Sequence, residues 1–118
     1  MNITNVLASV AVKEWGPAIA WYERLLGRPA DSSPDAGLAE WQFERGGRLQ
    51  VYRLAERAGA GSFTLAVTSL EDQTARLEKL GIDTRQRASG EKVKTLMIAD
   101  PDGNHIAFVE AVGPSLAE

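Results

Sequence analysis

The sequence predicts an α+β protein made of two tandem β-α-β-β-β modules, which form a cupped mixed sheet with helices on its outer face. Two observations lead to this prediction. A strand-like apolar run, followed by apolar residues at helical spacing and a closing glycine, occurs twice. Each predicted helix is then followed by two strands joined by a tight reversal. We interpret the chain as one domain, 1–118, with module 1 at about 3–56 and module 2 at about 61–112.

Module 1 opens with the apolar and β-branched run 6–12, which is typical of a buried strand. Pro17 suits the first position of a helix, and Gly27, 15 positions after Val12, suits its C-terminal cap. After this helix we expect a weakly marked strand near residue 30, a loop at 31–37, and strands at 38–44 and 48–54 joined by Gly46-Gly47.

Module 2 repeats this order of elements. The run 63–67 is strand-like, and Ser69 can cap a helix because Asp72 follows at the capping-box spacing. Gly81, 14 positions after Val67, closes that helix. We then expect a weakly marked strand at 83–87 and strands at 93–99 and 105–111, joined by the turn Asp100-Pro101-Asp102-Gly103-Asn104. The stretch 55–61 is the predicted linker between the modules, and the tail from Gly113 is predicted to fray.

Composition narrows the classes of function. The formal net charge is −3 and the chain has no basic block, which gives no reason to expect a nucleic acid or a membrane as partner. We expect a cytoplasmic protein, since the start of the chain lacks the features of a signal peptide. The chain has no cysteine and one histidine, His105, whereas transition-metal sites usually use several such ligands. We therefore expect no metal and no cofactor, although composition leaves a carboxylate-only Mg²⁺ or Ca²⁺ site open.

Three segments together resemble the vicinal oxygen chelate superfamily, which includes glyoxalase I, extradiol dioxygenases and bleomycin-resistance proteins. They are 12–27, 67–81 and, most specifically, Asp100-Pro101-Asp102-Gly103-Asn104 leading into 105–108. The resemblance spans about residues 3–111. Members that lack the metal site, such as bleomycin-binding proteins, bind a ligand in the concavity of the sheet, often as homodimers. The resemblance therefore implies a small-molecule partner and a homodimer.

The same resemblance locates the four metal-ligand positions of the family. They fall at Leu7, Gln50, Ser62 and Ala107, where the family usually has His, Glu, His and Glu. Leucine and alanine have no donor atom, and a neutral serine hydroxyl is a poor ligand. The resemblance thus implies a member without the metal site, closest in type to the bleomycin-resistance-like binding proteins.

The predicted hairpin turn suggests what lines the concavity. A two-residue Gly46-Gly47 turn would place Phe43 opposite Gln50 and Trp41 opposite Tyr52, on one face of the sheet. Flat rings there could stack on a planar or cationic ligand, but the same rings could simply be core. On this pairing Glu40 shares the opposite face with Leu49 and Val51, and we expect it to be solvated. The predicted ligand-binding residues are Leu7, Trp41, Phe43, Gln50, Tyr52, Ser62, Thr64, His105 and Ala107.

We therefore predict a metal-independent small-molecule-binding protein that sequesters a drug or toxin, and we assign no catalytic residue. One alternative is a lyase or isomerase of glyoxalase or dioxygenase type with unusual ligands. In a metal-free variant of it, His105 or Glu110 would act as acid or base. Another alternative is an accessory domain with a vestigial pocket. His105 itself is interpreted either as a turn or rim residue or as a hydrogen-bond partner of the ligand. The sequence leaves open whether the protein is an enzyme.

Overall fold

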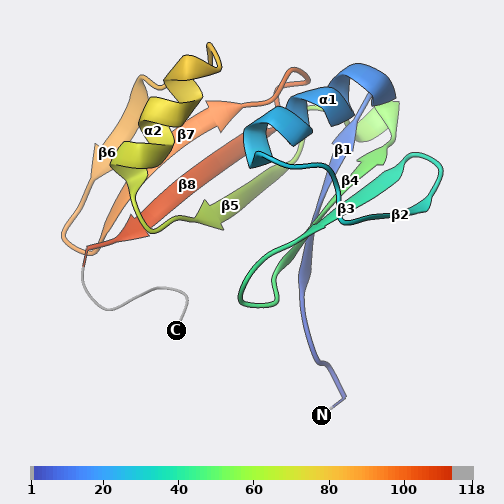
Figure 1. Cartoon of the computed structure of the whole chain (residues 1–118), viewed down its shortest axis with the longest axis horizontal. Helices are drawn as coiled ribbons and strands as arrows, with labels where there is room; N and C mark the ends of the chain where they lie inside the picture. Colours follow the sequence, from blue (N-terminus) through green and yellow to red (C-terminus); the bar gives the residue numbers. More distant parts are fainter. Residues whose placement is uncertain (1, 113–118) are drawn as a thin grey trace.

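The computed structural model describes residues 2–112, which form two α-helices and two four-stranded sheets (Figure 1). Module 1 contains β1 (Leu7–Val12), α1 (Trp15–Leu26), β2 (Ser32–Asp35), β3 (Leu38–Gln42) and β4 (Arg48–Arg53). A 3-10 helix, η1 (Ala55–Arg57), leads into module 2, which contains β5 (Ser62–Ala66), α2 (Leu70–Lys79), β6 (Gln86–Ser89), β7 (Val93–Ala99) and β8 (His105–Ala111). The tail from Gly113, predicted to fray, lies outside the described residues. Within the described part, no helix is long and apolar enough to cross a membrane.

The two sheets are built alike. Their strand orders are β1-β4-β3-β2 and β5-β8-β7-β6. The pairs β1–β4 and β5–β8 are parallel, and all other neighbouring strands are antiparallel. The registers also correspond, because Leu7 pairs with Arg48 in module 1 as Ser62 pairs with His105 in module 2. The predicted α+β fold of two β-α-β-β-β modules is therefore confirmed.

One hydrophobic core joins the two modules. Strand residues alternate between this core and the opposite face. Val10 and Val51, which pair between β1 and β4, are buried, whereas the preceding pair, Ser9 and Gln50, is more exposed. β1 and β5 are in contact, and α1 and α2 lie along the same side of the molecule (Figure 1). Each sheet thus has a face packed on the core and a helix-free face. The fully buried large side chains of this core are Trp41, Tyr22, Phe108, Leu25, Leu49, Leu77, Leu96, Ile106, Val10, Val12 and Val51.

Several boundaries differ from the prediction. α1 begins at Trp15, two residues before Pro17, and a proline is tolerated there because the N–H groups of the first turn have no intrahelical partner. β2 lies within 31–37, which we expected to be a loop, and β6 starts three residues later than predicted. All residues of both strands are exposed at a sheet edge, so their sequences carry no hydrophobic alternation.

The predicted pairing between β3 and β4 is wrong. The Gly46 amide donates to the Phe43 carbonyl and the Phe43 amide donates to the Gly47 carbonyl, so three residues rather than two form the loop. Gly46, with φ of 98°, supplies the left-handed residue that this hairpin requires. Trp41 therefore pairs with Leu49 and not with Tyr52. An odd shift in register moves the side chains of a strand to the other face.

Trp41 and Phe43 consequently do not share a face with Gln50. Trp41 is 0% exposed in the core and donates its indole N–H to the Arg28 carbonyl at 3.0 Å. Phe43 lies beyond the end of β3 and packs partly buried against the same core. The interpretation that these rings are simply core is the correct one for both. Glu40, which we expected on the core side and solvated, pairs instead with Gln50 on the helix-free face.

The turn between β7 and β8 fastens the two modules together. The side chain of Asn104 is 0% exposed, and its Nδ2 donates to the Ala11 carbonyl in β1 at 2.8 Å and to Asp100 at 2.7 Å. Its Oδ1 accepts from the backbone amides of Gly59 and Gly61 in the segment before β5. From the sequence we predicted only that this segment forms a turn. The structure shows that it also makes buried polar contacts between the modules.

Tyr22 completes this buried network, and its burial makes the protein less stable as the pH rises into the alkaline range. Its hydroxyl donates to Asp100 at 2.7 Å. Burial, together with the hydrogen bond to that carboxylate, raises the pKa of the Tyr22 phenol well above its ordinary range. Above about pH 10 the unfolded chain releases this proton and the native chain retains it, so the free energy of unfolding falls as pH rises.

The expected contribution is a loss of about 1.4 kcal/mol per pH unit above about pH 10. Urea unfolding of the wild type and Tyr22→Phe, compared at several alkaline pH values, measures it. The variant should be less stable near neutrality, because it leaves Asp100 without this donor, and its stability should fall less steeply with pH. Equal slopes for the two proteins would contradict the prediction.

Candidate functional site

The helix-free face of module 1 carries a continuous series of hydrogen bonds. The Ser9 hydroxyl donates to Gln50 Oε1 at 3.2 Å, and Gln50 Nε2 donates to Glu40 Oε2 at 3.0 Å. The other carboxylate oxygen, Glu40 Oε1, accepts from Arg48 Nη1 at 2.9 Å. We call these four residues the polar series. It lies on three adjacent strands, β1, β4 and β3, which bring together positions from 9 to 50 in the sequence.

Burial within the polar series is uneven. The side chain of Glu40 is 8% exposed, whereas that of Arg48 is 42% exposed. A buried carboxylate requires a charged or hydrogen-bonding partner, and Glu40 has both. The two oxygens of Glu40 in turn hold the Arg48 guanidinium and the Gln50 amide in place. The series therefore presents fixed groups toward solvent, with the negative charge underneath.

Sequence reasoning missed Glu40 as a site residue. One signal could have identified it. Ala39 and Trp41 alternate with Glu40 and Gln42, which is the pattern of a strand with one buried face. If Ala39 and Trp41 are paired with the apolar residues Val51 and Leu49 of the next strand, Glu40 falls on the same face as Gln50.

The helix-free face of module 2 lacks the carboxylate and the guanidinium that module 1 carries. Ser62 pairs with His105 and Thr64 pairs with Ala107, so these four predicted residues do share one face, as expected. Met97 lies beside Ala107 on β7, at the position that Glu40 occupies beside Gln50 in module 1. Strands β5 to β8, all of them described, carry no Asp, Glu, Lys or Arg on this face.

A hollow of about 190 Å³ opens next to His105. It extends from the helix-free face of module 2 to the segment before β6. Asp83 lies at its rim, where the Arg85 guanidinium holds the pKa of the carboxyl at about 2. The imidazole of His105 is exposed. The lining residues are Ile82, Asp83, Gln86, Met97, Ile98, Ala99 and His105.

The residues at the four family positions do not fit a divalent metal ion. Leu7 and Ala107 have no donor atom, and Ser62 offers a neutral hydroxyl. Gln50, at the second position, already accepts from Ser9 and donates to Glu40. The carboxylate of Glu40 is itself bonded to Arg48. Among residues 2–112, no three His, Asp or Glu side chains form a group that could hold a metal ion.

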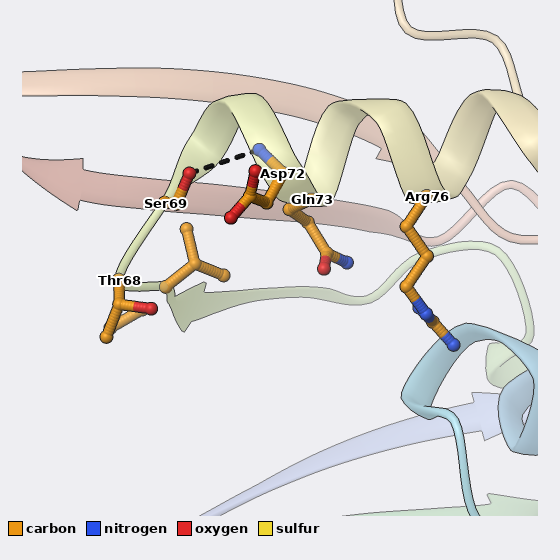
Figure 2. A pocket seen from close by; sticks show the side chains of 7 residues that line it. Thr68, Ser69, Asp72, Gln73 and Arg76 are labelled. Carbon is orange, nitrogen blue, oxygen red and sulfur yellow. Dashed lines mark hydrogen bonds between the residues drawn. The ribbon is translucent and has the colours of Figure 1, made fainter.

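A larger cavity, of about 390 Å³, lies at the start of α2 (Figure 2). None of the nine predicted site residues lines it. Ser69 caps the helix there by accepting from the Asp72 amide at 3.1 Å, as the sequence predicted. Arg76 reaches from this cavity to α1, where its guanidinium donates to the carbonyls of Arg24 and Leu25. Arg76 therefore caps the C-terminal end of α1 and joins the two helices.

The fold and the helix-free faces define a two-module protein of the glyoxalase and bleomycin-resistance type. The chain belongs to the glyoxalase-like domain family, whose family model matches residues 8–109. Membership in the vicinal oxygen chelate superfamily, predicted from the sequence segments, is thereby confirmed.

Solved structures agree with this assignment. A glyoxalase / bleomycin resistance protein from Catenulispora acidiphila is 34% identical, with a TM-score of 0.81 over 90% of this chain and 96% of that chain. An antibiotic-binding protein from a Streptomyces species is 21% identical, with a TM-score of 0.80 over 94% and 98%. A lactoylglutathione lyase from Agrobacterium tumefaciens is 17% identical, with a TM-score of 0.74 over 91% and 92%. The last two share the fold. No protein of curated function matches the sequence.

Proposed function

We propose that this protein binds a small organic molecule on the helix-free faces of its two sheets, without a metal ion, and thereby sequesters it. The observation that carries the proposal is the polar series. At the position where a family member would bind a metal through a carboxylate, this chain has Gln50, held by Ser9 and Glu40. A fixed amide is a recognition group for a ligand rather than a metal ligand.

The names of similar proteins are compatible with more than one function. One solved neighbour is described as antibiotic-binding and another as a lactoylglutathione lyase. The donor atoms of this chain favour binding over metal-assisted chemistry, because the residues at the four family positions are Leu, Gln, Ser and Ala. Pairing of two copies and a cytoplasmic location stay predictions. Sedimentation equilibrium and cell fractionation would test them.

Isothermal titration calorimetry with metal-free bleomycin and a panel of aromatic acids, amines and alcohols tests the proposal. We expect stoichiometric binding of at least one compound. Ala107→Trp should weaken that binding by at least about tenfold, because the indole would fill the helix-free face, and a factor of ten corresponds to 1.4 kcal/mol. The matched control is Ala75→Trp, on an exposed position of α2, which should bind as the wild type does.

Three results would contradict the proposal, two of them as to what the protein does and one as to where it binds. One is the absence of binding across the whole panel, which would favour an accessory domain with a vestigial pocket. The second is turnover of methylglyoxal and glutathione to lactoylglutathione, with or without added Zn²⁺ or Ni²⁺, which would favour the lyase alternative. Equal affinity of the two tryptophan variants would place the ligand elsewhere on the molecule.

A further inference from the structure

We infer that the ligand of the helix-free faces carries a carboxylate on an otherwise apolar body, and that Arg48 binds this carboxylate. The inference rests on the proposed function and names its ligand class. It differs from one part of the expectation drawn from the sequence, which allowed a planar or a cationic ligand, because it gives the ligand a negative charge. Three features of the structure lead to it: the free donors of the polar series, the burial of Glu40, and the absence of Asp, Glu, Lys and Arg from the helix-free face of module 2.

The polar series offers mainly donors toward solvent. The guanidinium of Arg48 has five N–H groups, and its hydrogen bond to Glu40 uses Nη1 alone. The side chain is 42% exposed, so its other donors are accessible. One N–H of the Gln50 amide also remains, since the other donates to Glu40. A planar guanidinium with free donors matches a carboxylate, which can accept two parallel hydrogen bonds from it.

The negative charge of Glu40 is poorly placed to attract a cation. Its side chain is 8% exposed, and each of its oxygens accepts a hydrogen bond from within the polar series. Of the three rings expected to line this face, Trp41 and Phe43 pack against the core instead, and Tyr52 stays on the face of Gln50, half-buried. The aromatic cluster that would have favoured a cation is therefore not formed. What a ligand meets at the surface of module 1 is therefore the cation, Arg48.

Module 2 supplies the surface for the rest of the ligand. Its helix-free face carries Thr64, Ala107, Val109 and Met97 together with the polar Ser62 and His105, and it carries no Asp, Glu, Lys or Arg. The carboxylate at the rim of the adjacent hollow, Asp83, is paired with Arg85 at 2.8 Å. An apolar body gains free energy from contact with such a surface, whereas a second charge there would lose hydration without a partner.

The test compares three probes that share one apolar body: 2-naphthoate, 2-naphthylmethanol and 2-naphthylmethylammonium. Calorimetry at low ionic strength should show that 2-naphthoate binds at least about tenfold more tightly than either of the others, because hydrogen bonds between two charged groups are stronger than those to a neutral partner. In Arg48→Gln this preference for the carboxylate should disappear. Arg48→Lys should restore part of it, because lysine keeps the charge but not the planar pair of donors.

Glu40→Gln should act in the opposite direction. It removes the charge that partly neutralises Arg48, so 2-naphthoate should bind several-fold more tightly and the ammonium probe more weakly. Lys79→Gln is the matched control, since it removes the same charge as Arg48→Gln from an exposed position of α2 and should leave all three affinities unchanged. If Glu40→Gln does not fold, the three probes and the Arg48 variants still decide the question.

The inference and the proposed function fail separately. Equal or tighter binding of the ammonium probe, or an unchanged preference in Arg48→Gln, would overturn the inference. So would failure of all three naphthyl probes to bind. In each case, binding of another member of the panel that is sensitive to Ala107→Trp would leave the proposed function standing.

Discussion

Replacing Asn104 with alanine is expected to lower the free energy of unfolding by about 3–5 kcal/mol, because three buried or half-buried backbone groups lose their partner and each costs about 1–3 kcal/mol. These groups are the Ala11 carbonyl and the amides of Gly59 and Gly61. Asp100 also loses one donor but retains Tyr22 and two backbone amides. Because the lost contacts join β1 to the segment before β5, the variant should also weaken the attachment of one module to the other.

Urea unfolding followed by circular dichroism measures this loss. Asn5→Ala is the matched control, since Asn5 is exposed and its side-chain amide donates to the Gly46 carbonyl at 2.8 Å. Surface substitutions of that kind usually change stability by less than about 0.5 kcal/mol. Similar losses in the two variants would show that the buried asparagine does not hold the modules together.

Trp41→Ala is expected to cost about 3–5 kcal/mol, the range for deleting a large aromatic side chain from a core. Trp41 is fully buried, its ring lies 6.4 Å from that of Tyr22, and its indole N–H bonds to the Arg28 carbonyl. The substitution would leave a cavity between α1 and sheet β1-β4-β3-β2 and an unpaired carbonyl at the end of that helix.

This variant also tests the register of the β3–β4 hairpin. If Trp41 lined the binding face, its removal would reduce ligand affinity and leave stability nearly unchanged. With Trp41 in the core, thermal unfolding should show the loss, and any protein that remains folded should still bind the ligand of the wild type. Trp15→Ala is the comparison, because Trp15 is only partly buried and should cost less. A loss below about 1 kcal/mol for Trp41→Ala would contradict the observed register.

Much of this fold could be predicted because its signals are local. The strands of the second hairpin, Val93–Ala99 and His105–Ala111, and the Ser69 cap appear where the sequence placed them. Gly27 caps α1 with φ of 78°, as expected of a glycine after the last apolar residue of a helix. The edge strands β2 and β6 could not be predicted with the same precision, since a strand exposed on both faces has no apolar period.

The candidate site was predictable only in part. In module 2 the shared face of Ser62, Thr64, His105 and Ala107 followed from strand parity, because β8 begins directly after a turn with an unambiguous sequence. In module 1 the prediction depended on one hairpin loop. The prediction took Gly46 and Gly47 as a two-residue turn, whereas in the structure Gly46 ends a three-residue loop. This difference shifts the register by an odd number of residues, and such a shift exchanges the two faces of β3.

The sequence by itself determined the two-module architecture and the residues of module 2 that face away from the core, whereas the four metal-ligand positions without donors were implied by its resemblance to the superfamily. Repetition, turn chemistry and hydrophobic alternation are properties of short segments, so they can be recognised without knowing which other segments pack against them. Only the tertiary structure decided that Trp41 is core and that Glu40 supports Gln50 and Arg48. The faces of β3 depend on its pairing with β4 and, through β4, with β1. Only one register buries the Trp41 indole in the core and at the same time gives the Glu40 carboxylate its partners.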